Sequence, residues 1–276
     1  MTDDAIDLNA YLRRIGHAGP VAPNLGTLEA VVLRHTATIA FENLDPLLGR
    51  PPKLDLGALQ QKLVQGGRGG YCYEQNLLLR AALAAIGFRV TLHLGRVLWG
   101  SADDAIPQRS HALLRVDLAD GPRIVDVGFG GQTLTGVLRL GTEDEQPTPH
   151  EPFRLVRAGD DFKLQARLWP DWRSLYRFDL QPQWPIDCEG PNWYVSTHPR
   201  SHFISGLSAA RIADGRRYAL RDADFAVHHL GGATERRRLA DRAEMKAVLT
   251  ETFGLTLPDD PGLDFALDRV LAATPP

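Results

Sequence analysis

The spacing of apolar residues divides the chain into a helical N-terminal part and a longer part rich in strands. Before residue 88, apolar side chains recur at a helical period, as Leu8, Tyr11 and Ile15 do at the start. Capping residues and glycines set the expected boundaries: Gly16 as a stop, Thr27 capping a helix to Leu33, Asp55 capping a third helix, and Gly87 ending a fourth from about Tyr73. The pattern predicts a helical bundle over residues 1–88.

After residue 88 the apolar period changes to the alternation that is typical of short antiparallel strands. The clearest runs are residues 90–97, 111–118, 123–127, 162–168 and 174–180, separated by Pro, Gly and Asp. A small barrel or curled sheet is therefore expected over residues 89–198. Beyond it, short strands near 203–207 and 217–220 precede a helix that Asp241 and Glu244 would cap and Gly254 would stop.

Composition bounds the class of protein. The chain has 276 residues, 43% hydrophobic and 24% charged, which suits a large folded core and excludes a disordered chain. Its formal charge of -3 gives no global positive field for nucleic acid or an anionic membrane. The acidic first residues do not resemble a targeting signal, and no apolar run reaches the roughly 18 to 20 residues of a membrane span. We expect a cytoplasmic protein that binds neither nucleic acid nor membrane.

Cys72 follows a glycine-rich loop, residues 66–71, at the point where the predicted helix begins. Unpaired first-turn amides and the positive end of a helix dipole favour a thiolate there, so this position suits a cysteine nucleophile. The alternative is a flexible loop followed by a buried helical cysteine, and the segment alone favours neither. Cys188, the other cysteine, is expected to be a free buried thiol.

A nucleophilic cysteine needs a base, and the hairpin over residues 111–127 selects one of the nine histidines. With the turn at Ala119 and Asp120, Leu118 pairs with Gly121, and His111 and Asp126 share one face as diagonal neighbours about 7 Å apart. An acid that interrupts an apolar strand needs a partner, and His111 is the obvious one. A surface polar pair is the usual alternative for two such residues.

These segments together resemble one enzyme family. Residues 68–76, Arg-Gly-Gly-Tyr-Cys-Tyr-Glu-Gln-Asn, are similar to the signature around the active cysteine of arylamine N-acetyltransferases. Ser110-His111 and the run from Val125 to Gly130 resemble the histidine and aspartate segments of that family, as do residues 41–44 and 192–203. The chain departs from the family at Ala40, where proline is usual, and this change is expected to affect loop rigidity only.

The resemblance implies an α+β protein in three parts: a helical bundle (1–88) that carries Cys72, an antiparallel β-barrel (89–198) that carries His111 and Asp126, and an α/β lid (199–276). It implies acetyl-CoA as co-substrate, no metal, and an arylamine, hydrazine or N-hydroxyarylamine as acceptor in ping-pong chemistry. The residues then expected to contact CoA or the acceptor are Phe41, Tyr71, Tyr73, Gly128, Phe129, Gly130 and Phe203. For each aromatic residue among them, core packing is the common alternative.

Three other functions stay open at this level. An amide synthase would use the same triad to close a macrolactam, and a transglutaminase-like or papain-like hydrolase shares the logic of a cysteine, a histidine and an aspartate. A non-enzymatic binding module would leave Cys72 unreactive. The sequence decides neither the physiological amine nor whether the protein forms a homo-oligomer.

Overall fold

The computed structural model describes residues 5–273, and its N-terminal part is helical. The helices are α1 (Leu8–Arg14), α2 (Leu25–Thr38), α4 (Leu56–Leu59), which continues into a π-helical turn (Gln60–Gln65), and α5 (Cys72–Ile86). Gly16 and Gly87 have positive φ angles of 64° and 106°, as stops at helix ends require. Asp55 accepts a hydrogen bond from the Ala58 amide, so the predicted cap of α4 is confirmed.

The predicted cap of the second helix is wrong. Asn24 caps α2 by accepting the Thr27 amide at 3.0 Å, and the helix continues beyond Leu33 to Thr38. Thr27 is therefore the third residue of the helix. Asn and Thr both suit an N-cap. Asn24 is the residue used, and the longer helix that starts after it buries a longer apolar face.

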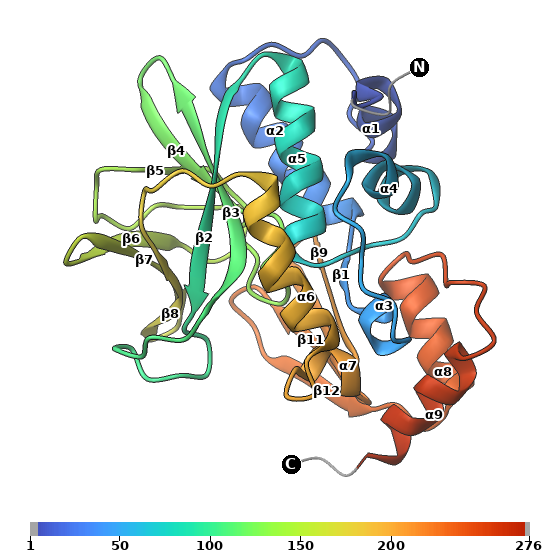
Figure 1. Cartoon of the computed structure of the whole chain (residues 1–276). Helices are drawn as coiled ribbons and strands as arrows, with labels where there is room; N and C mark the ends of the chain where they lie inside the picture. Colours follow the sequence, from blue (N-terminus) through green and yellow to red (C-terminus); the bar gives the residue numbers. More distant parts are fainter. Residues whose placement is uncertain (1–4, 274–276) are drawn as a thin grey trace.

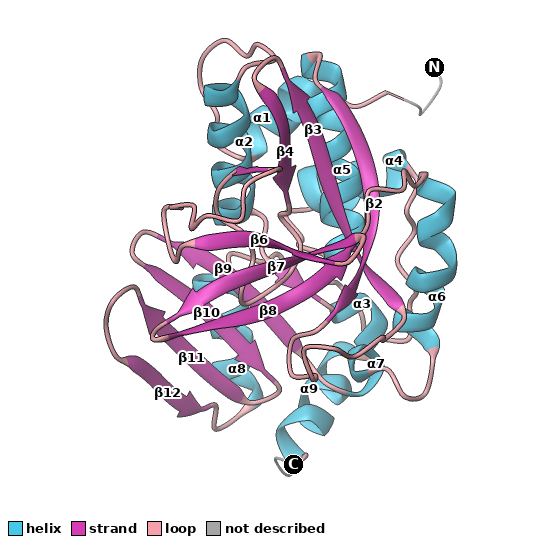
Figure 2. Ribbon diagram, turned by 90° about the vertical axis from the view of Figure 1, so that its left-hand side faces the viewer, coloured by secondary structure: helices cyan, strands magenta, loops and turns pink. Residues whose placement is uncertain are grey.

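The middle of the chain forms a strongly curved antiparallel sheet, nearly closed into a barrel (Figures 1 and 2). Its spatial order within the described residues is β5-β4-β3-β2-β8-β7-β6. The strands are β2 (Arg89–Val97), β3 (Arg109–Leu118), β4 (Gly121–Val125), β5 (Leu138–Arg139), β6 (Phe153–Ala158), β7 (Asp161–Leu168) and β8 (Asp171–Phe178). The antiparallel barrel expected from the alternating pattern is confirmed.

The two faces of the β3–β4 hairpin enter different cores. Ala112, Leu114 and Val125 pack against the helices, chiefly α5, in one apolar cluster. Leu113 and Ile124 point the other way, into the interior of the barrel. Since strand residues alternate between faces, the same alternation directs His111 and Asp126 toward the barrel side.

The last part of the chain contains a second sheet with the order β1-β9-β10-β11-β12. Its strands are β1 (Phe41–Glu42), β9 (Ser208–Ala213), β10 (Arg216–Arg221), β11 (Asp224–His229) and β12 (Thr234–Arg238), and α8 (Arg242–Ala247), a π-helical turn (Val248–Thr252) and α9 (Leu263–Ala272) pack on it. Strand β1 and helix α3 (Leu44–Leu47) come from the N-terminal part, so the bundle contributes an edge strand and core residues to the lid. The Asp241 cap and the Gly254 stop are confirmed.

One predicted strand is a helix. Residues near 203–207, expected as a strand, form α7 (His202–Ser205), because the Ser201 side chain accepts the Phe203 amide at 3.3 Å and starts a helical turn. The preceding segment, a 3-10 turn (Pro185–Cys188) and α6 (Glu189–Thr197), packs against the helical core beside α5 (Figure 1).

Candidate active site

Cys72 is the first residue of α5, and the loop before it is held tightly by backbone contacts. Gly70 donates to the Ala40 carbonyl and accepts from the Glu42 amide, each at 3.2 Å. A Cβ at Gly69 would lie 2.1 Å from the Ala40 carbonyl oxygen, closer than two atoms can approach. Gly69 is therefore required by the close packing of the loop against residues 40–42, which fixes the position of Cys72.

A buried group of five charged side chains supports the same loop. Arg68 donates two hydrogen bonds to Glu42 at 2.9 and 2.7 Å, and both Arg68 and Lys62 reach Asp45. Lys62 also pairs with Glu74 at 2.6 Å, and Glu74 accepts the Tyr71 amide at 3.0 Å. The group has three carboxylates and two cations. Burial, together with the nearby Glu42 carboxylate, raises the pKa of Glu74 to about 7. This network attaches the start of α5 to α3 and β1.

His111 and Asp126 form the pair expected from the hairpin. Strands β3 and β4 pair Leu118 with Gly121 and Leu114 with Val125, the register deduced from the sequence. The His111 Nε2 atom lies 2.7 Å from Asp126 Oδ2, and both side chains are buried. The surface-pair alternative is therefore excluded for these two residues.

Asn76 is a site residue that the sequence reasoning did not select. Its Nδ2 donates to Asp126 Oδ1 at 3.0 Å and to the Ala112 carbonyl at 2.8 Å, and its Oδ1 accepts the Val127 amide at 3.2 Å. Asn76 lies one helical turn after Cys72, so it fixes the cysteine helix to both strands of the pair. The sequence carries one sign of its role, a polar residue within an apolar helix, and the structure shows that this position is fully buried.

The cysteine, histidine and aspartate meet at one point. Cys72 and His111 line the same cavity, and Cys72 lies close enough to contribute to the raised pKa of His111. The Cys72 Sγ atom is 3.8 Å from the Ser110 carbonyl oxygen. Burial by itself would raise the pKa of Asp126, but the His111 charge and the hydrogen bonds from His111, Asn76 and Gly128 lower it. Asp126 is therefore an anion that orients the imidazole and stabilises its protonated form.

The charge on His111 predicts a pH dependence of stability. Burial would lower the pKa of His111, but the Asp126 carboxylate and the contact with Cys72 raise it to about 10. Since the unperturbed pKa is 6.5, protonated His111 stabilises the fold fully below about pH 6.5, and this contribution is lost as the pH rises toward 10. We expect the difference in free energy of unfolding between wild type and His111→Gln, measured in urea, to shrink over that range. A difference independent of pH would contradict the assignment.

Aromatic rings enclose the imidazole. Phe129 packs edge-on against His111 with ring centroids 5.1 Å apart, and the Tyr176 ring lies at 4.7 Å. The Tyr176 hydroxyl is buried near Asp126 without a hydrogen bond among the described residues. These rings exclude water from the pair, which strengthens its electrostatic interaction.

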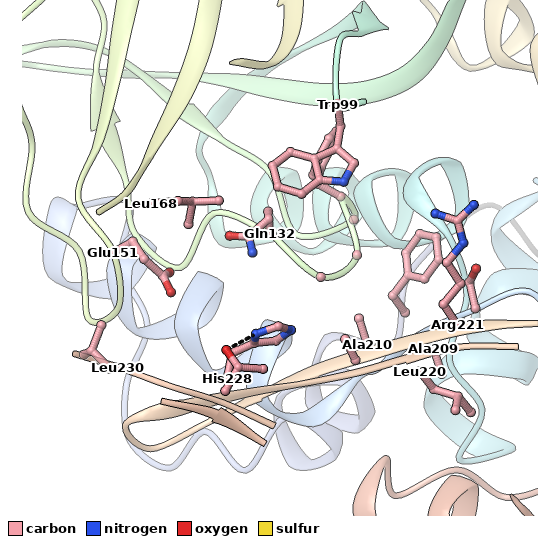
Figure 3. Close-up of a pocket in the computed structure, with 18 of the residues that line it drawn as sticks. Trp99, Gln132, Glu151, Leu168, Ala209, Ala210, Leu220, Arg221, His228 and Leu230 are labelled. Atoms are coloured by element: carbon pink, nitrogen blue, oxygen red, sulfur yellow. Dashed lines mark hydrogen bonds between the residues drawn. The ribbon is translucent and has the colours of Figure 1, made fainter. Parts of the chain in front are cut away.

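A cavity of about 1150 Å³ opens from Cys72 between the barrel and the lid. Figure 3 shows Trp99, Gln132, Glu151 and Leu168 on the barrel side, and Ala210 and Leu220 on the lid strands. Of the residues predicted to contact CoA or the acceptor, these line the cavity: Phe41, Gly128, Phe129, Gly130 and Phe203. Lining residues that the sequence reasoning missed include Trp99, Gln132, Trp169, Arg221, His228 and Arg236.

Tyr71 and Tyr73 do not line the cavity, contrary to expectation. Both are fully buried. The Tyr71 hydroxyl donates to Asn192 on α6, and the Tyr71 ring packs between Tyr73 and Phe203 at 5.7 Å from each. Tyr71 is the N-cap of α5 and Tyr73 is its second residue, and both rings pack in the apolar core that α6 also enters.

Gly128 makes a hydrogen bond and a close backbone contact that its position in a glycine-rich turn did not predict. Its amide donates to Asp126 Oδ1 at 2.9 Å and helps to orient that carboxylate, and a Cβ there would lie 2.6 Å from Cys72 Cα. We expect Gly128→Ala to displace Cys72 and lower kcat by about 10²-fold. Gly131→Ala is the matched control, because its Cβ would meet nothing within 4 Å. Steady-state kinetics of both variants test this, and equal rates would contradict it.

Neither a candidate metal site nor a membrane-spanning helix is found in the described part of the chain. No group of three or more His, Cys, Asp or Glu side chains between residues 5 and 273 is arranged to hold a metal ion. Over the same residues, no helix combines the length and the apolar character that crossing a membrane requires.

A buried histidine held by a carboxylate beside a helix-start thiol is the arrangement of cysteine-nucleophile enzymes. Residues 24–261 match the family model described as N-acetyltransferase. The chain is 49% identical to the arylamine N-acetyltransferase of Mycolicibacterium smegmatis, over 94% of this chain and 96% of that one. It is 46% identical to the Mycobacterium tuberculosis enzyme of the same name, over 98% of each chain.

Comparison with solved structures points to the same family. The arylamine N-acetyltransferase of Mycobacterium marinum in complex with CoA superimposes with a TM-score of 0.91 at 44% identity, covering 96% of this chain and 99% of that one. The M. smegmatis structure gives a TM-score of 0.93 at 48% identity, covering 98% and 100%. The chain belongs to the arylamine N-acetyltransferase family, as its sequence motifs indicated, and it is an acyltransferase of that family.

Proposed function

We propose that the protein transfers an acetyl group from acetyl-CoA to an arylamine, arylhydrazine or N-hydroxyarylamine through a thioester on Cys72. The observation that carries the proposal is the buried pair of His111 Nε2 and Asp126 Oδ2, 2.7 Å apart, at a cavity that both His111 and Cys72 line. The mostly apolar cavity in front of it suits a flat aromatic acceptor and the narrow arm of CoA.

Before the first half-reaction the Cys72 proton is held by His111 in a thiolate–imidazolium pair, and the thiolate then attacks the thioester carbonyl carbon. The bond from that carbon to the CoA sulfur breaks, and CoA leaves with the proton from His111. The first amides of α5 have no partner within the helix and are suitable donors to the oxyanion. Asp126 stays ionised throughout and holds the imidazole in place.

In the second half-reaction, the amine nitrogen attacks the Cys72 thioester while His111 accepts one of its protons. The Cys72–acyl bond breaks, the acetylated amine leaves, and the thiolate–imidazolium pair is restored. The same cleft serves both steps because CoA departs before the acceptor reacts. Phe41, Phe129 and Phe203 offer apolar ring faces to the aromatic part of the acceptor.

Mass spectrometry of the intact protein tests the first half-reaction. We expect one acetyl group to be added when the protein is mixed with acetyl-CoA alone, and none to be added to Cys72→Ala. Cys188→Ala is the matched control and is expected to gain the acetyl group, because Cys188 is sealed in the core and burial raises the pKa of its thiol to about 12. Acetylation of Cys72→Ala, or none of the wild type, would refute the mechanism; loss of the group on adding an arylamine tests the second half.

A further inference from the structure

The side-chain amide of Gln132 has an unused hydrogen-bonding atom inside the cavity. Its Oε1 is buried, and no donor among the described residues reaches it. Gln132 lines the same cavity as Cys72, and Figure 3 shows its carboxamide pointing into the space between the barrel and the lid strands. A buried acceptor without a partner destabilises the free protein, so a bound molecule that supplies a donor would gain affinity there.

The backbone that carries Gln132 is fixed on both sides. The Thr133 amide donates to the Gly130 carbonyl at 3.0 Å and closes a turn, and Gly130 has a φ of 84° that favours glycine. The buried Arg217 of β10 donates to the Thr133 carbonyl at 2.9 Å and to the Gly131 carbonyl at 3.4 Å. The carboxamide is therefore presented by a rigid turn that the lid holds in place, as a preorganised binding group should be.

Its position suits the donor substrate of the proposed function. Gly128 of the same loop contacts Cys72, and Gln132 follows four residues later, so it lies within about 14 Å of the cysteine. Arg221 and Arg236 line the same cavity on the lid strands and suit the phosphates of CoA. An arm that joins a thioester at Cys72 to phosphates at these arginines would cross the space that Gln132 faces.

The chemistry of the group favours the same ligand. A carboxamide carries an acceptor oxygen and a donor NH₂ group side by side, which matches another amide better than a single amine. The pantetheine arm of CoA contains two amides. An acceptor amine must instead place its nitrogen at Cys72 and His111, where it is committed to the reaction.

We propose that Gln132 binds a pantetheine amide of acetyl-CoA and is a specificity residue for the donor half-reaction only. This inference rests on the proposed function. The contact forms with the substrate arm, remote from the reacting carbonyl, so it acts on donor binding before chemistry. Donors that lack the amide therefore gain nothing from Gln132.

Gln132→Leu, which keeps the size and removes both polar atoms, tests the proposal. We expect kcat/KM for acetyl-CoA to fall about tenfold, mostly through KM. Acylation of Cys72 by p-nitrophenyl acetate, which has no amide, is expected to be unchanged. Because the reaction is ping-pong, kcat/KM for the arylamine is also expected to be unchanged. S-Acetyl-N-acetylcysteamine, with one amide, shows which of the two amides is bound: an equal loss assigns the amide nearer the sulfur, and no loss assigns the farther one.

Gln181→Leu is the matched control, since Gln181 is exposed and does not line the cavity. An equal loss with p-nitrophenyl acetate would mean that Gln132 supports the fold of the site, and a loss confined to the arylamine would assign it to the acceptor. Either result, or no loss at all, would overturn the proposal. Failure of wild type to be acetylated by acetyl-CoA would refute the proposed function itself, and that result does not depend on Gln132.

Discussion

Asp126→Asn is expected to lower kcat/KM by about 10³- to 10⁴-fold while the fold is kept. Asp126 Oδ1 accepts from both Asn76 Nδ2 and the Gly128 amide, so an asparagine would keep its oxygen at that position. Its NH₂ group would then face His111 Nε2 in place of Oδ2. The imidazole would be forced to carry its proton on the nitrogen that faces Cys72, and it could no longer accept the thiol proton.

Kinetics with acetyl-CoA and an arylamine measure this loss, with near-UV circular dichroism as the test of folding. Asp117→Asn is the matched control on the same hairpin, where the carboxylate is partly exposed and pairs with Arg115. A change within a few-fold is expected there. If Asp126→Asn retained more than a tenth of the wild-type rate, the assignment of Asp126 as the orienting group would be wrong.

Arg68→Met is expected to destabilise the protein by about 3 to 5 kcal/mol. Arg68 is buried and makes two hydrogen bonds to Glu42, whose side chain is 0% exposed, so its removal leaves a buried carboxylate with its nearest cation, Lys62, 3.9 Å away. The same change would loosen the loop before Cys72, since Glu42 is part of β1, which pairs with Gly70.

Urea denaturation measures this free energy, and Arg50→Met provides the comparison. Arg50 pairs with Asp260 at 2.9 Å, but its side chain is 47% exposed, so we expect a change of about 1 kcal/mol or less. The double variant Arg68→Met with Glu42→Gln should recover part of the lost stability, because it removes the uncompensated charge. Equal effects of Arg68→Met and Arg50→Met would show that the network contributes little.

The hairpin shows what the sequence was able to predict. Alternation places His111 and Asp126 on one face, and the turn at Ala119 and Asp120 sets the register, so both depend only on local rules. The position of Cys72 at a helix start is equally local. These rules bring the histidine and aspartate together, and the family motifs supplied the link to Cys72.

Other features depend on distant contacts and carried no local signal. Asn76 acts through strands far along the chain, and Tyr71 turns inward because α6 supplies Asn192. Strand β12 reads Thr-Glu-Arg-Arg-Arg and has almost no apolar alternation, because it is an edge strand with most of its side chains exposed. Periodicity detects a half-buried strand and misses an exposed one.

The short strand β1 links the N-terminal helical part to the C-terminal lid. It pairs with β9 of the lid and, through Phe41, with Gly70 beside the cysteine. Ala40, Leu44 and Leu47 fill the core beneath the lid sheet. A fragment without the C-terminal residues would therefore leave this apolar surface in water and release one side of the loop before Cys72. Recombining lids between relatives would require exchanging residues 40–47 with them, because that segment pairs with β9 and fills part of the lid core.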